Sequence, residues 1–269
     1  MQKTVLSCLL LVLAGCASVP SGKPDPRDPW ERFNRSVFNF NEALDRAIAK
    51  PVAKGYVKVT PRVVRTGISN AYSNIDTVPT VINDVLQGKF RQAGHDSARF
   101  LMNSTLGLGG LFDPASAAGL DSNDEDLGQT LGKWGVKAGP YLMLPVLGPS
   151  SVRDAFSRAA DTYIEPVYYL EDDSTRYWIR LGDLLDQRAS LLELDAQLER
   201  SYDRYAFIRN AWIQRREYQV KDGDVDDQSL ELEEEFKDDP DASPAPGTDQ
   251  TPAPAPAPAD PAQPTPPPK

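Results

Sequence analysis

Apolar side chains recur every three or four residues along most of the chain between residues 28 and 220. This spacing places them on one face of an α-helix. The first such face consists of Phe33, Val37, Phe40, Leu44 and Ile48, with Asn34, Arg35, Asn41 and Asp45 off it. Asp28 and Pro29 are typical of a helix start, and Pro51 is expected to end the helix.

The same spacing predicts further helices along this part of the chain. They are expected to begin near Thr60, Val78, Phe90, Ser150, Ser174 and Asp203. Gly88 and Gly107 are expected to close two of them. Strict alternation of apolar and polar positions, the pattern of half-buried strands, is missing from the sequence, so we predict a mainly α fold.

The N-terminal residues have the pattern of a bacterial lipoprotein signal. Lys3 supplies a positive charge, residues 5–12 are apolar, and Leu13-Ala14-Gly15 lead to Cys16. The apolar run is shorter than the ~20 residues that a membrane-spanning helix needs. We expect residues 1–15 to be removed, Cys16 to carry a covalent lipid, and residues 16–27 to link this anchor to the fold. The alternative is an ordinary secretory signal in which Cys16 is incidental.

The C-terminal residues differ from the body in charge and composition. Residues 221–269 contain 13 acids and 3 bases, and this segment accounts for the net charge of −10 of the whole chain. Of the 24 prolines, 12 lie between residues 240 and 268. Such a composition cannot bury enough apolar surface to offset its conformational entropy. We therefore predict one helical domain at residues 28–220 and a disordered acidic, Pro/Ala-rich tail at residues 221–269.

A glycine-rich segment interrupts the helical pattern. Half of the 18 glycines lie between Gly107 and Gly148, among apolar side chains. Apolar residues mixed with helix breakers make neither a good helix nor a well-solvated loop. The segment is either a buried connection on the core or a hinged element that lines an apolar cavity or contacts acyl chains.

Five stretches occur in the order typical of one known family. They are residues 28–41, 109–115, 126–136, 139–149 and 205–216, with sequences such as DPWERFNRSVFNFN and GPYLMLPVLGP. On these stretches the chain resembles the MlaA (VacJ) family of phospholipid-transport lipoproteins of Gram-negative outer membranes. The resemblance covers most of the predicted helical domain.

The resemblance implies a compact ring-like bundle of amphipathic helices with a glycine-rich hairpin, seated in the periplasmic leaflet of the outer membrane. A central amphipathic channel is then expected to remove mislocalised phospholipids from the outer leaflet. A periplasmic MlaC-like lipid shuttle would receive them, and a trimeric porin would lie beside the protein. The alternative function is that of a structural envelope lipoprotein associated with porins.

The resemblance also suggests which residues form the gate. We expect a hairpin that flanks the channel and contains Gly132, Gly135, Gly139, Pro140, Tyr141, Leu142, Met143, Leu144 and Gly148. Residues 67–70 match a second stretch near the channel, so Asn70 and Ala71 are candidates for channel-adjacent positions. The order Ala71-Tyr72 departs from the aromatic-first order expected there.

The sequence has few features that are typical of an enzyme. His95 is the only histidine, and we expect it at a helix surface or cap. No Gly-x-Ser-x-Gly elbow or spaced His/Cys ligand set accompanies it, so we predict no catalytic residue, no metal and no cofactor besides the N-terminal lipid.

Two clusters of charged residues have competing interpretations. They are Arg204, Arg209, Arg215 and Arg216, and Arg153, Asp154 and Arg158 beside Phe156. An exported body that is nearly neutral argues against nucleic acid. The first cluster would meet lipid phosphates or porin carboxylates, or would form a solvated face. The second would line a polar path for headgroups, or would likewise be a solvated face.

Overall fold

The computed structural model describes residues 25–224, so the signal segment, Cys16 and most of the tail lie outside the described residues. Its helical elements are α2 (Glu31–Leu44), the π-helix η1 (Asp45–Ala49), α3 (Lys50–Val59), α4 (Arg62–Leu86), α5 (Phe90–Thr105), α6 (Pro114–Ala117), α7 (Leu127–Lys133), α8 (Val152–Asp161), the 3₁₀ turn η2 (Pro166–Tyr169), α9 (Asp173–Ser190), the 3₁₀ turn η3 (Leu191–Glu193), α10 (Asp195–Leu198) and α11 (Arg204–Val220). The strands are β1 (Tyr141–Leu144) and β2 (Gly148–Ser151). The predicted mainly α fold is confirmed.

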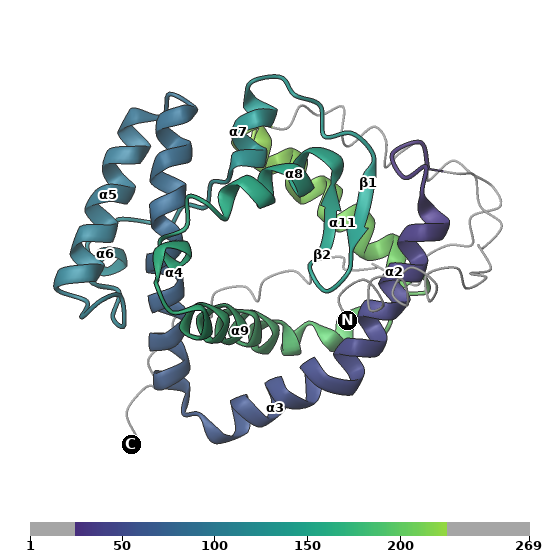
Figure 1. The fold of residues 1–269 in the computed structure, drawn as a ribbon, viewed down its shortest axis with the longest axis horizontal. Helices are drawn as coiled ribbons and strands as arrows, with labels where there is room; N and C mark the ends of the chain where they lie inside the picture. The colour runs from purple at the N-terminus through teal and green to yellow at the C-terminus, as the bar shows by residue number, and fades with distance from the viewer. Residues whose placement is uncertain (1–24, 225–269) are drawn as a thin grey trace, which may run out of the picture. The chain divides into compact units, whose positions relative to one another are not determined.

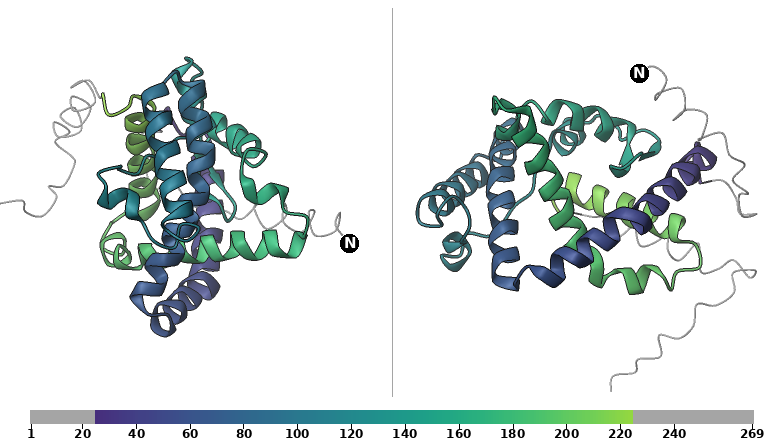
Figure 2. Two further views of the ribbon diagram at one scale, coloured as in Figure 1. Left: turned by 90° about the vertical axis from the view of Figure 1, so that its left-hand side faces the viewer. Right: turned by 60° about the horizontal axis from the view of Figure 1, so that its bottom comes forward.

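The helices contact one another in a closed circuit, which gives residues 25–224 the form of a ring (Figure 1). α2 continues through η1 into α3, α3 packs on α9, and α9 packs on α4. α4 contacts α7, α7 contacts α8 and α11, α11 contacts β2, and β1 returns to α2. α5 lies alongside α4 on the outer side of the ring, and α6 packs on α5 (Figures 1 and 2).

Two predicted helix ends are wrong. Pro51 does not end the first helix, because the wider π turn of η1 precedes it and the Lys50 N–H donates to the Asp45 carbonyl. Pro51 then lies in the first turn of α3, where proline is tolerated. Likewise, the helices predicted to begin near Thr60 and Val78 form the single helix α4, with Pro79 inside it.

Two predicted caps are wrong as well. α2 begins at Glu31, and Asp28 is instead a buried residue with its own partners. The cap of α8 is Ser151, whose Oγ accepts a hydrogen bond from the Asp154 N–H at 3.1 Å, whereas Ser150 lies in β2. His95 lies in the middle of α5 and is partly exposed, so it is on a helix surface, as expected, and not at a cap.

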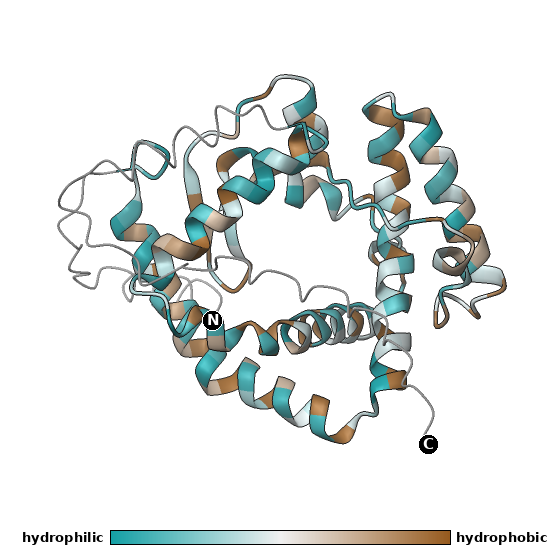
Figure 3. Ribbon diagram, turned by 180° about the vertical axis from the view of Figure 1, so that it is seen from behind, coloured by the Kyte–Doolittle hydropathy of each residue, from teal (hydrophilic) through white to brown (hydrophobic). Residues whose placement is uncertain are grey.

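The distribution of apolar residues departs most from the sequence analysis. Among residues 25–224, 33 large hydrophobic residues are exposed, and the buried set comprises 20 polar or charged residues against 11 hydrophobic ones. Hydrophobic positions are spread along the outer helices rather than gathered at one centre (Figure 3). One apolar core cluster lies where α2, β1 and α11 meet: Val37, Phe38, Tyr141, Met143, Tyr205 and Ile213. Within the described part of the chain, no helix is long and apolar enough to span a membrane.

Candidate functional site

The glycine-rich segment contains an antiparallel hairpin, as the sequence analysis expected. Tyr141 pairs with Ser151 and Leu144 pairs with Gly148. Tyr141 and Met143 are buried, and Leu142 and Leu144 are half-buried. In the turn, Val146 and Leu147 are exposed, and Val146 has a left-handed backbone with φ of 67°. The hairpin thus has a buried first strand and an exposed apolar turn.

Two asparagines of α2 hold the free edge of β1. The side chain of Asn34 donates to the Tyr141 carbonyl at 3.0 Å and accepts from the Met143 N–H at 2.9 Å. Asn41 lies two helical turns further on, donates to the Leu144 carbonyl at 2.9 Å and accepts from the Val146 N–H at 2.8 Å. Their amides satisfy backbone groups that a third strand would otherwise pair. In the sequence both asparagines simply lie off the apolar face of the helix, and helical spacing does not reveal this role.

Asn34 and Asn41 together form a clamp on β1, and Asp28 connects this clamp to α11. One of its carboxylate oxygens accepts from Asn34 at 2.7 Å, and the other accepts from the Tyr205 hydroxyl and from Arg209 at 3.3 Å. Burial and the carboxylate of Asp28 together raise the pKa of Tyr205, so its hydroxyl stays protonated and donates. The Tyr205 ring packs edge-on against Tyr141 with 6.3 Å between ring centroids.

The four glycines predicted for the gate have different roles. Gly135, Gly139 and Gly148 have φ values of 91°, 71° and 81°, which other residues adopt at a cost. Gly132 is helical, and a Cβ added there would lie 2.6 Å from Arg153 Nη1 and 2.7 Å from Val220 Cγ1. Gly132 therefore permits close packing of α7 on α8 and α11, while the other three shape the path into and out of the hairpin. Pro140 follows Gly139, and its carbonyl accepts from the Val152 N–H at 3.1 Å.

A buried ion-pair network fixes the base of the hairpin. Asp154 accepts hydrogen bonds from Ser151 Oγ at 2.7 Å, Arg153 Nε at 3.0 Å and Arg216 Nη2 at 2.9 Å. Burial alone would raise the pKa of Asp154, but the hydrogen bonds, from Arg216 above all, hold it below its usual value. Arg216 also binds Asp126 through both terminal nitrogens, at 2.7 and 2.6 Å.

The solvated-face interpretation of these charged clusters is wrong for several of their members. Arg153, Asp154, Arg209 and Arg216 are buried. Arg204 binds Glu42 at 2.6 Å, within the chain. Arg158 stays exposed and donates to the Leu147 carbonyl at 3.3 Å.

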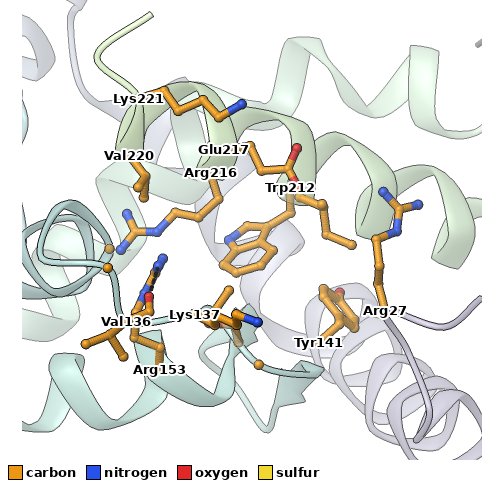
Figure 4. A pocket seen from close by; sticks show the side chains of 16 residues that line it. Arg27, Val136, Lys137, Tyr141, Arg153, Trp212, Arg216, Glu217, Val220 and Lys221 are labelled. Atoms are coloured by element: carbon orange, nitrogen blue, oxygen red, sulfur yellow. Dashed lines mark hydrogen bonds between the residues drawn. The ribbon is translucent and has the colours of Figure 1, made fainter. Parts of the chain in front are cut away.

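A cavity of about 400 Å³ lies between residues 132–139 and α11 (Figure 4). Trp212, Ile213 and Tyr141 are among its apolar walls, and charged side chains stand among them. The indole of Trp212 packs edge-on against Tyr141, with 5.7 Å between ring centroids. The cavity therefore shares a wall with the first strand of the hairpin.

The other candidate residues lie elsewhere. Asn70, in α4, donates to the Leu111 carbonyl at 3.4 Å, and Ala71 beside it is half-buried. Both belong to the part of α4 that meets the loop at residues 106–112, where Leu106, Leu108, Leu111 and Phe112 are exposed. In residues 25–224 no group of three or more His, Cys, Asp or Glu side chains is arranged to hold a metal ion.

These features define a ring of amphipathic helices with many exposed apolar side chains and a strand hairpin clamped to its first helix. The family model described as MlaA lipoprotein matches residues 26–219. The chain belongs to this family.

Named relatives agree with this assignment. The chain is 34% identical over 246 residues to the intermembrane phospholipid transport system lipoprotein MlaA of Escherichia coli, covering 88% of this chain and 97% of that one. It is 38% identical over 196 residues to an uncharacterized protein of Rickettsia prowazekii, covering 72% and 78%. A solved chain from a study of the "Structural basis for maintenance of bacterial outer membrane lipid asymmetry" is 37% identical, with a TM-score of 0.64 over 72% of this chain and 98% of that chain.

Proposed function

We propose that this protein is an outer-membrane lipoprotein that removes mislocalised phospholipids from the outer leaflet through an amphipathic channel. It would pass them to a periplasmic MlaC-like shuttle and so maintain lipid asymmetry. The relative in Escherichia coli is named for intermembrane phospholipid transport, and this supports the assignment. The function requires no catalytic residue.

The observation that carries the proposal is the set of 33 exposed large hydrophobic side chains among residues 25–224. Each large apolar side chain left in water forgoes about 1.5–3 kcal/mol of burial free energy. Contiguous exposed apolar patches mark surfaces that meet a partner or a membrane. Acyl chains around the outer helices would cover these residues. We place the ring in a single leaflet, the periplasmic one, as the family resemblance implies.

The anchor and the partners complete the proposal. Cys16, outside the described residues, would carry the covalent lipid that retains the protein at the outer membrane. A trimeric porin would lie beside the ring, where exposed apolar residues of the outer helices could pack against it. Phospholipid is the transported ligand.

The test is made in cells that lack the protein. Outer-leaflet phospholipid is measured in intact cells by its sensitivity to an added phospholipase. The wild-type chain should reduce this signal, and Cys16→Ala should fail to do so and fractionate away from the outer membrane. A chain that reaches the outer membrane, binds a porin and leaves the phospholipid signal unchanged would instead be a structural envelope lipoprotein.

The hairpin is the proposed gate, and a disulfide can lock it. A Cβ built at Gly139 would lie 3.3 Å from the Cβ of Val152, near the ~3.5–4.5 Å of disulfides. Gly139→Cys combined with Val152→Cys should therefore join the entry of β1 to α8. The oxidised protein should not clear phospholipid, and reductant should restore clearance.

Controls separate locking from damage to the fold. The positive φ of Gly139 makes any side chain there costly, so Gly139→Cys alone and Val152→Cys alone must each retain clearance. Full clearance by a verified crosslinked protein would show that this part of the hairpin need not move, and the gate would be abandoned.

A further inference from the structure

The cavity beside the hairpin has the lining of a small amphiphile site. The cavity has a volume of about 400 Å³ and lies between residues 132–139 and α11. Its apolar lining consists of Val136, Tyr141, Trp212, Ile213 and Val220. Pockets that hold small molecules have volumes of about 300–1,000 Å³ and mostly apolar walls with a few placed polar groups. This cavity has the size and the apolar character for one acyl chain.

Five cationic residues also line the cavity: Arg27, Lys137, Arg153, Arg216 and Lys221. Three of them are already neutralised. Asp154 binds both Arg153 and Arg216. Asp25 binds Arg27 at 2.9 Å.

Lys137 and Lys221 are different. Both are exposed, and neither forms an ion pair with any carboxylate of residues 25–224. The only acid in the lining is Glu217, so the two lysines leave a positive excess at the rim. An ammonium group is a common ligand of phosphate.

The cavity wall is held in place by the buried network. Arg153 donates to the Val136 carbonyl at 3.2 Å while its other nitrogens bind Asp154. In Figure 4 the side chains of Arg153 and Arg216 converge at one end of the cavity, and the indole of Trp212 lies between them and Tyr141. A ligand in the cavity would touch Tyr141, a residue of the hairpin.

We propose that this cavity binds one phospholipid, with an acyl chain against Trp212 and Ile213 and the lipid phosphate attracted by the positive charge of Lys137 and Lys221. The inference rests on the proposed function and adds to it a resting site for the lipid next to the gate. Inorganic phosphate shares the charge but would leave the apolar walls without a partner, so we commit to the lipid as the occupant.

The test uses the fluorescence of Trp212. Trp30, Trp134 and Trp178 are all exposed, so replacing each by Phe leaves Trp212 as the only tryptophan with little disturbance of the fold. The purified full chain in detergent is titrated with phosphatidylglycerol brominated on its acyl chains. We expect saturable quenching of Trp212, because bromine quenches an indole only at close contact.

Charge variants then test the headgroup. Lys137→Glu with Lys221→Glu should raise the half-saturating lipid concentration about tenfold or more. Lys137→Gln with Lys221→Gln should give a smaller rise. Because this pair only removes the charges, it checks that the effect of the glutamate pair does not come from misfolding. Lys54→Glu with Lys58→Glu is the matched control, since these two lysines are exposed on α3 and form no ion pair within residues 25–224. This control should leave the titration unchanged.

The outcomes separate the possible ligands. Quenching that is relieved by excess inorganic phosphate or glycerol 3-phosphate would make this a site for a free phosphate and overturn the lipid proposal. Equal half-saturation in all charge variants would overturn it too.

The cellular assay separates this inference from the proposed function. If wild-type protein clears phospholipid and Lys137→Glu with Lys221→Glu clears it equally well, the cavity inference fails alone. If wild-type protein clears none, the transport function fails, whatever the titration shows.

Discussion

The hairpin region and the outer pair differ in the kinds of residue that they bury. The hairpin region, formed by α2, β1, β2 and α11, has an apolar core cluster with Val37, Phe38 and Met143, and it also buries polar residues such as Asn34 and Arg216. In the outer pair, formed by α4 and α5, all five buried residues of α4 are polar: Asn74, Thr77, Thr80, Asn83 and Asp84. In α5 the buried residues are Asp96, Arg99 and Asn103 besides Ala93.

The comparison indicates that the two regions are suited to different surroundings. Hydrogen bonds satisfy many of the polar groups inside the outer pair, such as that from Arg99 to Asp113 at 2.6 Å and that from Thr130 to Asn83 at 2.7 Å. Large apolar residues of the same helices, such as Ile82, Phe90 and Leu101, are exposed. A helix pair with polar groups inside and apolar side chains on its surface suits acyl chains better than water. The hairpin region instead combines an apolar core cluster with buried hydrogen bonds and ion pairs.

The largest effect is expected from breaking the ion-pair network of the hairpin region. Asp154→Ala leaves Arg153 buried and without this carboxylate, and removes one of the two carboxylates of Arg216. We expect the free energy of unfolding to fall by about 3–5 kcal/mol, measured by denaturant titration in detergent. Asp173→Ala, which breaks the exposed pair with Arg176 in α9, should cost less than about 1 kcal/mol. Similar losses for the two variants would contradict the central role of Asp154.

The next effect concerns the clamp on β1. Asn34→Ala removes three hydrogen bonds at a fully buried position, so the Tyr141 carbonyl and the Met143 N–H lose their partner. We expect a loss of about 2–4 kcal/mol. Proteolysis in the turn at residues 145–147 should become faster.

Asn41→Ala is the comparison variant. Its two bonds lie nearer the surface, where water can replace them, and the loss should be about 1 kcal/mol. If Asn41→Ala destabilises as much as Asn34→Ala, the clamp acts at the turn rather than at the buried strand.

Sequence alone predicted the elements better than their surroundings. Helical spacing located the outer pair, but spacing cannot distinguish an apolar face against a core from one against lipid. Phe90 and Phe156 lie in predicted helices, and they are 71% and 76% exposed. The π turn before Pro51 depends on i→i+5 bonding, for which the sequence has no clear signal.

The candidate site was predicted in part. The hairpin residues followed from the family resemblance. Residues 141–144 and Gly148 lie on the two strands, whereas Gly132 lies in α7, and Gly135, Gly139 and Pro140 lie between α7 and β1. The clamp by Asn34 and Asn41 joins residues more than a hundred positions apart, which no local pattern reveals. The same holds for the network around Asp154, since Asp126 and Arg216 reach it from separate helices. Two asparagines on one face of α2, two turns apart, were the available signal.

A third, smaller effect is expected from a buried carboxylate inside the outer pair. Asp84 and Asp96 are both buried, and Asn123 lies 3.3 Å from a carboxylate oxygen of each. Burial, followed by the neighbouring carboxylate of Asp96, raises the pKa of Asp84 to about 7. The folded state therefore favours the protonated form, so this stability is present below about pH 4 and is lost as the pH rises through 7.

Asp84→Asn should remove this dependence. The variant should be more stable than the wild type by about 1–2 kcal/mol at pH 8 and show little or no gain at pH 5. The measurement is the midpoint of unfolding in detergent across this pH range. A variant that is equally destabilised at both pH values would mean that Asp84 serves packing and hydrogen bonding rather than proton binding.

The smallest effect on stability, and the sharpest test of the comparison, comes from the apolar loop that joins α5 to α6. Leu106 and Phe112 are 72% and 59% exposed, so Leu106→Ser with Phe112→Ser removes little contact within the protein. We expect the free energy of unfolding in detergent to change by less than about 0.5 kcal/mol. Transfer of such side chains from water to an apolar phase is worth about 1.5–3 kcal/mol each, so binding to phospholipid vesicles should weaken at least tenfold. Flotation with vesicles measures this binding, in a Cys16→Ala background so that no covalent lipid holds the chain to the membrane.

The control variant is Val37→Ser with Ile213→Ser, at buried positions of the hairpin region. It should destabilise the fold severely. If the loop variant floats as well as its parent, water or protein rather than lipid covers this loop.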